Sequence, residues 1–196
     1  MTERRTCMMN RMLLIIDPQI DFITGTLPVP GAVSAMDSLG EYIRTKAADY
    51  ARIVVTADRH PMCHCSFRTN GGEWPVHCVA DSVGAAIWPA VMNELLAVSD
   101  KVTVFHKGEN PDKDEYSIFK NLEASQRIVK LLCDENIGQI DVCGIAGDIC
   151  VADTIRDGLR ILRDVRLNLL VSFSPSLDGG KTIGKLISEL GLSSNT

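Results

Sequence analysis

Short apolar runs divide the chain at regular intervals and set its predicted architecture. Residues 11–16 are apolar almost throughout, which is typical of a strand buried on both faces of a sheet. Four further short, mostly apolar runs predict strands at residues 53–57, 102–106, 139–143 and 165–171.

Segments with helical spacing alternate with these strands. In residues 32–48, the side chains of Val33, Met36 and Leu39 fall on one helix face. Because strands that alternate with helices form parallel sheets covered on both faces, we predict a three-layer α/β/α fold. The other predicted helices span residues 91–98, 121–136, 150–162 and 180–190.

Two segments show neither the apolar runs of the predicted strands nor the spacing of the predicted helices. Residues 21–31 are rich in glycine and proline, and residues 58–81 form a long irregular stretch rich in histidine, cysteine, glycine and proline. Loops of that length inside a compact domain are usually functional or disordered. A length of 196 residues favours a single domain over residues 1–196, with residues 1–10 as a loosely ordered N-terminus.

Charge and composition narrow the class of protein. The formal net charge of −5 argues against general nucleic-acid binding, and no apolar run reaches membrane-spanning length. The N-terminus does not resemble a signal peptide, so a cytoplasmic location is expected. Seven cysteines, an odd number, favour reduced thiols over a disulfide framework.

Three reactive residue types stand where predicted strands end. Asp17 follows the first strand, Lys107 follows the third, and Cys150 follows the fourth, behind a loop with two glycines. In parallel sheets, ligands bind outside the carboxyl ends of the strands. A thiol there can act as a nucleophile, a carboxylate can accept its proton, and an ammonium can stabilise negative charge. Each residue alone also fits a turn cap, a solvated lysine or a buried apolar thiol.

The 58–81 loop carries a candidate metal site. Asp58 and His60 point the same way if the backbone is extended, which Pro61 favours. His64 and His77 lie in the same loop. One carboxylate with two or three imidazoles suits zinc, iron or manganese with open positions for water or a ligand. Surface histidines in a polar loop are the plainer interpretation.

A competing metal site uses thiolates. Cys63, Cys65 and Cys78 flank His64 and His77, so a structural zinc site in a non-enzymatic module is an alternative. The Cys-x-Cys spacing differs from the usual Cys-x-x-Cys clamp.

Aromatic residues near these groups are candidate walls for a flat ligand. Phe22 and Trp74 offer ring faces, and Tyr116 offers a hydroxyl to the same pocket. Each of them also fits ordinary loop packing.

Together, these residues resemble the nicotinamidases within the isochorismatase-like cysteine hydrolases. The resemblance covers most of the chain, and the metal-loop pieces distinguish it from isochorismatases and carbamoyl-amide hydrolases. The matching pieces are residues 13–22 (LLIIDPQIDF), 58–61 (DRHP), 74–79 (WPVHCV), 105–110 (FHKGEN) and 144–151 (GIAGDICV).

The resemblance implies an activity and a catalytic apparatus. It implies a metal-dependent amidohydrolase that converts nicotinamide to nicotinate and ammonia through a thioester, in NAD salvage. Asp17, Lys107 and Cys150 are similar to the family's triad. Ala146 is similar to the residue that follows a cis peptide bond, and its N–H joins that of Cys150 as an oxyanion hole. A homo-oligomer is also expected.

The resemblance also implies a cofactor and a substrate pocket. Asp58, His60 and His77 are similar to the ligands of one divalent metal ion, with His64 as a fourth. Zinc is expected first, with iron and manganese as alternatives. The remaining residues resemble substrate-binding positions, where Phe22 and Trp74 sandwich a pyridine ring and Tyr116 lies nearby. A related hydrolase of another small amide is the closest alternative function.

The chain departs from the family at two places that affect the fold. Gly147 stands where the family usually has threonine before Asp148, so one local hydrogen bond is expected to be missing. No strand is evident after Leu190, where the family often has a sixth. We therefore predict five strands in the order 3-2-1-4-5.

Overall fold

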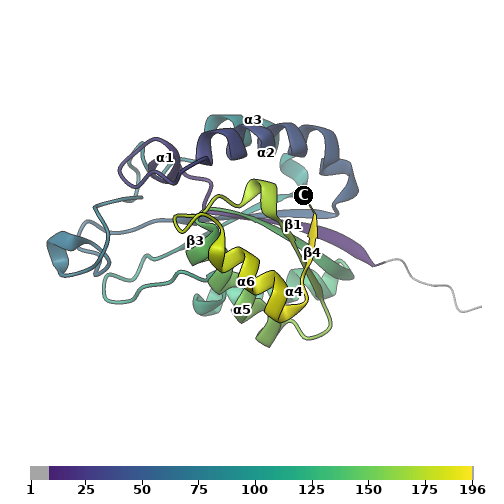
Figure 1. The fold of residues 1–196 in the computed structure, drawn as a ribbon. Helices are drawn as coiled ribbons and strands as arrows, with labels where there is room; N and C mark the ends of the chain where they lie inside the picture. Colours follow the sequence, from purple (N-terminus) through teal and green to yellow (C-terminus); the bar gives the residue numbers. More distant parts are fainter. Residues whose placement is uncertain (1–8, 196) are drawn as a thin grey trace, which may run out of the picture.

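The computed structural model describes residues 9–195 and contains a parallel sheet with helices on both faces (Figure 1). The strand order is β3-β2-β1-β4-β5-β6. The strands are β1 (Asn10–Ile16), β2 (Arg52–Asp58), β3 (Val102–Lys107), β4 (Ile137–Gly144), β5 (Arg166–Leu170) and β6 (Ser193–Asn195).

The helices connect these strands in sequence. The α-helices are α1 (Ile20–Ile23), α2 (Ala32–Lys46), α3 (Pro89–Ala97), α4 (Leu122–Asp134), α5 (Ala152–Ile161) and α6 (Lys181–Leu190). Short 3₁₀ turns are η1 (Ala47–Asp49), η2 (Arg68–Asn70), η3 (Ser99–Lys101), η4 (Ile118–Lys120) and η6 (Val171–Phe173), and η5 (Gly147–Val151) is a π-helical turn.

Two hydrophobic clusters lie on opposite faces of the sheet. Alternate residues of β1 serve the two sides, because successive side chains of a strand point to opposite faces. Leu13 and Ile15 pack with the residues of α2 and α3, whereas Leu14 and Ile16 pack with those of α4 and α5. Figure 1 shows α2 and α3 above the sheet and α4, α5 and α6 below it. The near-continuous apolar run of β1 follows from this double burial.

The predicted fold class is confirmed, with one strand added. The order 3-2-1-4-5 is observed, but the prediction that no strand follows Leu190 is wrong, because β6 pairs with β5 in parallel. A three-residue strand is too short to produce a recognisable apolar run. Of the predicted loose N-terminus, residues 1–8 lie outside the described part of the chain, and Asn10 already belongs to β1.

The carboxyl ends of the central strands meet at one edge of the sheet, which is where the candidate residues lie. Asp17 follows β1, and Asp58 and Lys107 end β2 and β3. The 58–81 segment stays irregular, held by isolated bridges between His60 and Val79 and between Phe67 and Trp74. Within residues 9–195, no helix is long and apolar enough to cross a membrane.

Candidate active site

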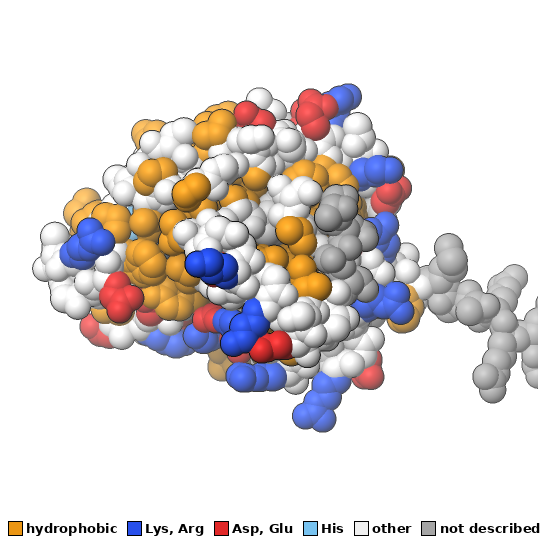
Figure 2. Space-filling model, viewed as in Figure 1, with side chains coloured by type: hydrophobic (Ala, Val, Ile, Leu, Met, Phe, Trp, Pro, Cys, Tyr) orange, Lys and Arg blue, Asp and Glu red, His pale blue; other side chains and the backbone are white. Residues whose placement is uncertain are grey.

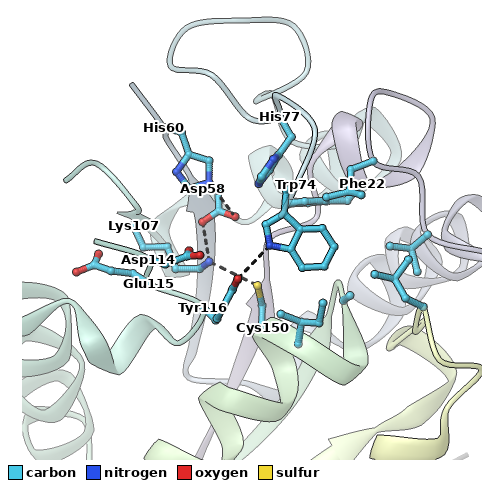
Figure 3. A pocket seen from close by; sticks show the side chains of 15 residues that line it. Phe22, Asp58, His60, Trp74, His77, Lys107, Asp114, Glu115, Tyr116 and Cys150 are labelled. Atoms are coloured by element: carbon cyan, nitrogen blue, oxygen red, sulfur yellow. Dashed lines mark hydrogen bonds and ion pairs between the residues drawn. The ribbon is translucent and has the colours of Figure 1, made fainter. Parts of the chain in front are cut away.

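Asp17, Lys107 and Cys150 come together at the carboxyl edge of the sheet (Figure 3 shows Lys107 and Cys150). The Lys107 ammonium lies 2.8 Å from a carboxylate oxygen of Asp17 and 3.7 Å from the Cys150 sulfur. All three residues are buried, and Lys107 is only 1% exposed. The long apolar stem of Lys107 thus carries its charge into the interior, where charge interactions are strong.

Backbone and side-chain bonds fix Asp17 at the end of β1. Thr56 on the adjacent strand β2 donates its hydroxyl to Asp17 Oδ1 at 2.6 Å, and the Thr56 carbonyl accepts the Asp17 N–H at 3.1 Å. Asp17 has a left-handed backbone, with φ of 46°, a region that aspartate tolerates better than bulkier residues. Its carboxylate is therefore held in one orientation.

The loop before Cys150 depends on a glycine. Gly144 has φ of 126°, and a Cβ there would lie 2.0 Å from the Ile16 carbonyl oxygen. This close approach lets Ile145 donate its N–H to Ile16 at 2.8 Å, joining the nucleophile loop to β1. The Ile145–Ala146 peptide bond is cis, as the resemblance implies. Single π-helical turns such as η5 occur often at functional sites, and η5 presents Cys150 to the pocket.

Burial and charge interactions together set the protonation states of the triad. Burial raises the pKa of Asp17 to about 6, although Lys107 opposes the shift. Burial also raises the pKa of the Cys150 thiol well above its usual range, again against the effect of Lys107. Burial alone would lower the pKa of Lys107, but the carboxylates of Asp17 and Asp58 raise it well above its usual range. At neutral pH, the site therefore holds a thiol, a carboxylate and an ammonium.

The predicted oxyanion-hole residues both line the pocket. Ala146 and Cys150 lie on its wall, and the Ala146 carbonyl accepts the N–H groups of Ile149 and Val151. Among the hydrogen bonds found within residues 9–195, none uses the Ala146 N–H as its donor. That amide is therefore free to donate to a bound ligand.

Asp58, His60 and His77 form a group suited to a metal ion. One ligand atom from each lies within 4.8 Å of the other two, and all three residues are buried. His60 donates its Nδ1 hydrogen to the Gly108 carbonyl at 2.8 Å, and His77 donates its Nδ1 hydrogen to the Pro75 carbonyl at 2.8 Å. A carbonyl can only accept, so each imidazole keeps the Nε2 lone pair for a metal. The residues present fit a divalent cation.

His64 lies beside this group but is not part of it. Its ring stacks on His60 with centroids 4.1 Å apart. His64 Nδ1 lies 2.7 Å from the Ser66 hydroxyl and 3.3 Å from the Ser66 N–H, and the Lys113 carbonyl lies 3.2 Å from Nε2. Because an N–H only donates and a carbonyl only accepts, Nδ1 is the acceptor and Nε2 carries the hydrogen. Both ring nitrogens of His64 are thus engaged in hydrogen bonds, and its role as a fourth ligand stays a prediction.

The alternative thiolate site finds no comparable group. Cys63 is exposed, Cys65 is half-buried and Cys78 is buried. The only two potential metal-binding groups within residues 9–195 are Asp58 with His60 and His77, and Asp17 with Asp58 and Cys150. The structure therefore favours the carboxylate and imidazole set.

Lys107 and Cys150 of the triad line a single pocket together with all three residues of the metal group, and Asp17 lies fully buried outside its lining. Phe22, Trp74 and Tyr116 all line it, and Trp74 donates its indole N–H to the Tyr116 hydroxyl at 3.0 Å. Figure 3 shows Trp74 and Phe22 beside His77, above the Cys150 sulfur. The pocket lining also includes apolar side chains, namely Leu27, Val29, Ile149 and Leu177. In Figure 2, which has the view of Figure 1, orange hydrophobic atoms gather toward the left, at the end of the molecule that carries the 58–81 loop.

The structure explains the missing threonine at residue 147. A Cβ on Gly147 would lie 2.4 Å from the Ser176 hydroxyl and 2.6 Å from the Ser174 carbonyl oxygen. The Gly147 N–H donates to the Pro175 carbonyl at 2.8 Å. The 174–176 segment therefore occupies the space that a larger side chain at residue 147 would need.

Sequence reasoning missed several supporting residues. Gln19 is fully buried, and its amide exchanges two hydrogen bonds of 2.7 Å with the backbone of Asp58. Thr56 donates a hydrogen bond to Asp17. The sequence offers a clue to this role, because Thr56 is the one polar residue inside the apolar run 53–57. Glu115 is buried near the pocket, and nothing in its loop sequence indicates that.

Comparison with known proteins agrees with this architecture. The isochorismatase domain family matches residues 11–165, most of the chain, and the chain therefore belongs to that family of hydrolases. The nicotinamidase of Escherichia coli (strain K12) is 33% identical over 169 residues, covering 77% of each chain. This relationship confirms the resemblance to nicotinamidases.

Solved structures show the same fold. Pyrazinamidase of Pyrococcus horikoshii in complex with zinc has a TM-score of 0.80 and 29% identity, covering 95% of this chain and 99% of that one. PnC1 from L. infantum in complex with nicotinate has a TM-score of 0.79 and 26% identity, covering 96% and 93%.

Proposed function

We propose that this protein is a nicotinamidase, which hydrolyses the carboxamide of nicotinamide to nicotinate and ammonia in NAD salvage. The observation that carries the proposal is the convergence of two sets of residues on one pocket. The thiol of Cys150, with Asp17 and Lys107, supplies amide hydrolysis. The lone pairs of His60 and His77 point to a cation next to it. A triad alone would suit any small amide, whereas the cation adds recognition of a ring nitrogen.

Asp58, His60 and His77 would hold a divalent metal ion, which we propose to be zinc. The zinc complex of the related pyrazinamidase supports this identity. When bound, the ion supplies an electrophilic site for the pyridine nitrogen. The residues of the chain do the remaining work of binding, proton transfer and charge stabilisation.

Attack begins from a protonated thiol. Phe22 and Trp74 hold the pyridine ring so that the carboxamide carbon faces Cys150. The Cys150 thiol transfers its proton to Asp17, one of whose oxygens lies within 4.8 Å of the sulfur, as sulfur bonds to the carbon. The N–H groups of Ala146 and Cys150 donate to the oxygen that becomes negative. The Lys107 ammonium stabilises Asp17 throughout.

The second half of the reaction reverses the role of Asp17. Protonated Asp17 gives its proton to the departing nitrogen, ammonia leaves, and a thioester remains on Cys150. A water molecule then attacks the thioester while Asp17 takes a proton from it. The bond from carbon to sulfur breaks, nicotinate leaves, and the thiol is restored by the proton held on Asp17.

The raised pKa of Asp17 predicts an acid limb in the pH profile. Asp17 must be ionised to accept the thiol proton, and burial raises its pKa to about 6. We therefore expect kcat/KM for nicotinamide to fall about tenfold for each pH unit below 6. Steady-state rates between pH 4.5 and about 8 check this, with circular dichroism as the control for folding. A profile flat down to about pH 4.5 would exclude a base with this pKa.

The hydrogen bonds of His64 predict that it supports His60 and does not bind metal. Replacement of His64 by phenylalanine keeps a ring against His60 but removes both nitrogens. We expect H64F to retain one metal ion per chain and a large part of its activity. Metal analysis of the purified variant checks this, and a loss of metal would restore His64 as the fourth ligand.

A substrate panel separates this function from its rivals. We expect ammonia from nicotinamide and little turnover of N-carbamoyl amides or isochorismate, since these lack the ring nitrogen. Preference for a carbamoyl amide would assign the protein to another branch of the same family. No ammonia from any amide, with metal lost when Cys63 and Cys65 become serine, would favour the zinc module. The cytoplasmic location and the homo-oligomer stay predictions.

A further inference from the structure

Gly108 is the backbone contact that orients the metal ligand His60. Its carbonyl accepts the His60 Nδ1 hydrogen at 2.8 Å, which fixes the ring and its tautomer. Gly108 has φ of 68°, and a Cβ there would lie 2.3 Å from His60 Cε1. The His60 ring therefore packs directly on this glycine.

Glu115 is the side chain that holds Gly108 in place. Its Oε2 accepts the Gly108 N–H at 3.2 Å and the side-chain amide of Asn121 at 3.5 Å. Its Oε1 accepts the Lys113 ammonium at 2.9 Å. Glu115 is 7% exposed, whereas the Lys113 side chain is 50% exposed. Glu115 lies on the same side of the pocket as Lys107, opposite Phe22 (Figure 3).

We propose that Glu115 is a positioning residue for the metal site, acting on His60 through Gly108. This inference rests on the proposed function, because it assumes that His60 binds a metal ion. The chain of contacts runs from Glu115 Oε2 to the Gly108 N–H, and from the Gly108 carbonyl to His60 Nδ1. Direct hydrogen-bond partners of metal ligands, here the Gly108 carbonyl, typically contribute about 10–100-fold to metal affinity, and Glu115 acts by holding that partner.

The alternative is that Glu115 only orders its own loop. In that case the ion pair with Lys113 is the important contact, since Lys113 also donates to the Lys120 carbonyl at 2.8 Å. The two explanations differ in which substitution matters. Removing the acceptor for the Gly108 N–H tests whether Glu115 positions His60. Removing the Lys113 ammonium tests whether Glu115 only orders its own loop.

Three near-isosteric variants separate these explanations. Glu115→Met keeps the side-chain length and removes the acceptor, Glu115→Gln keeps an acceptor and removes the charge, and Lys113→Met removes only the cation. Each protein, freed of metal by a chelator, is titrated with zinc in competition with a chromophoric chelator. The thermal unfolding midpoint of each metal-free protein reports on the fold independently of metal binding.

We expect E115M to bind zinc about 10–100-fold more weakly than the unchanged protein, with a similar midpoint when metal-free. E115Q and K113M should each stay within about threefold of the unchanged protein. Equal affinity in E115M, or an equal loss in K113M, overturns the role of Glu115 while leaving the metal site intact. If E115M does not fold, a tenfold loss in folded E115Q overturns the hydrogen-bond explanation. An unchanged protein that binds no zinc overturns the metal site as well.

Discussion

Replacing Cys150 by alanine reduces ammonia release from nicotinamide by about 10⁴-fold or more in this account, the scale seen when a covalent nucleophile is removed. The thiol provides the only sulfur next to both Asp17 and Lys107 within residues 9–195. Without it, no thioester forms, and only water attack assisted by the oxyanion donors remains. Coupled ammonia detection over hours is sensitive enough to check this.

The control for the Cys150 variant is the exposed Cys133 on α4, which lies outside the pocket. C133A should match the unchanged protein in rate, which excludes a general effect of losing a thiol. C150A should keep one metal ion per chain, because Cys150 is not among the three proposed ligands. Turnover by C150A within about tenfold of the unchanged protein would rule out a nucleophilic role.

Replacing His60 by alanine removes the bound metal and reduces kcat/KM by about 10²–10⁴-fold, the scale of several kcal/mol of lost electrophilic assistance. His60 supplies one of two imidazole lone pairs, and both its geometry and its tautomer are fixed by Gly108. Since the ring nitrogen of nicotinamide loses its partner, KM should rise. Mass spectrometry of the purified variant checks the loss of metal, and initial rates check the changes in kcat/KM and KM.

His106 is the matched control for this substitution. It belongs to β3 like Lys107 but is exposed and lies outside the pocket that holds the triad. H106A should keep metal and activity. A full complement of metal in H60A would show that the ligands are assigned wrongly, and lost metal with an unchanged rate would remove the ion from catalysis.

The convergence of the three proposed catalytic residues is predictable from the sequence, because a parallel sheet places them by topology. Asp17, Lys107 and Cys150 each follow a short apolar run, and the carboxyl ends of such strands meet at one edge. Their convergence therefore follows from strand order, which the resemblance supplied. The 58–81 loop was recognisable as a candidate metal site, since Asp58 and His60 lie two residues apart in extended backbone.

The parts that sequence reasoning could not reach depend on contacts between loops. Glu115 lies in a polar loop, and its link to His60 exists only because Gly108 folds against both. His64 matches a metal-ligand pattern, but its hydrogen bonds to Ser66 and Lys113 appear only once the loop is folded. A ligand pattern in sequence does not show which lone pairs remain free.

Trapping the thioester with hydroxylamine is the most direct test of the account. Hydroxylamine attacks an acyl-cysteine to give a hydroxamate and the free thiol, and it competes with water for the same carbonyl carbon. We predict that the metal-loaded protein converts nicotinamide and hydroxylamine to nicotinohydroxamate and ammonia, while nicotinate formation falls correspondingly. Nicotinate as the only acyl product at every hydroxylamine concentration, with ammonia released at its usual rate, would contradict a covalent intermediate on Cys150.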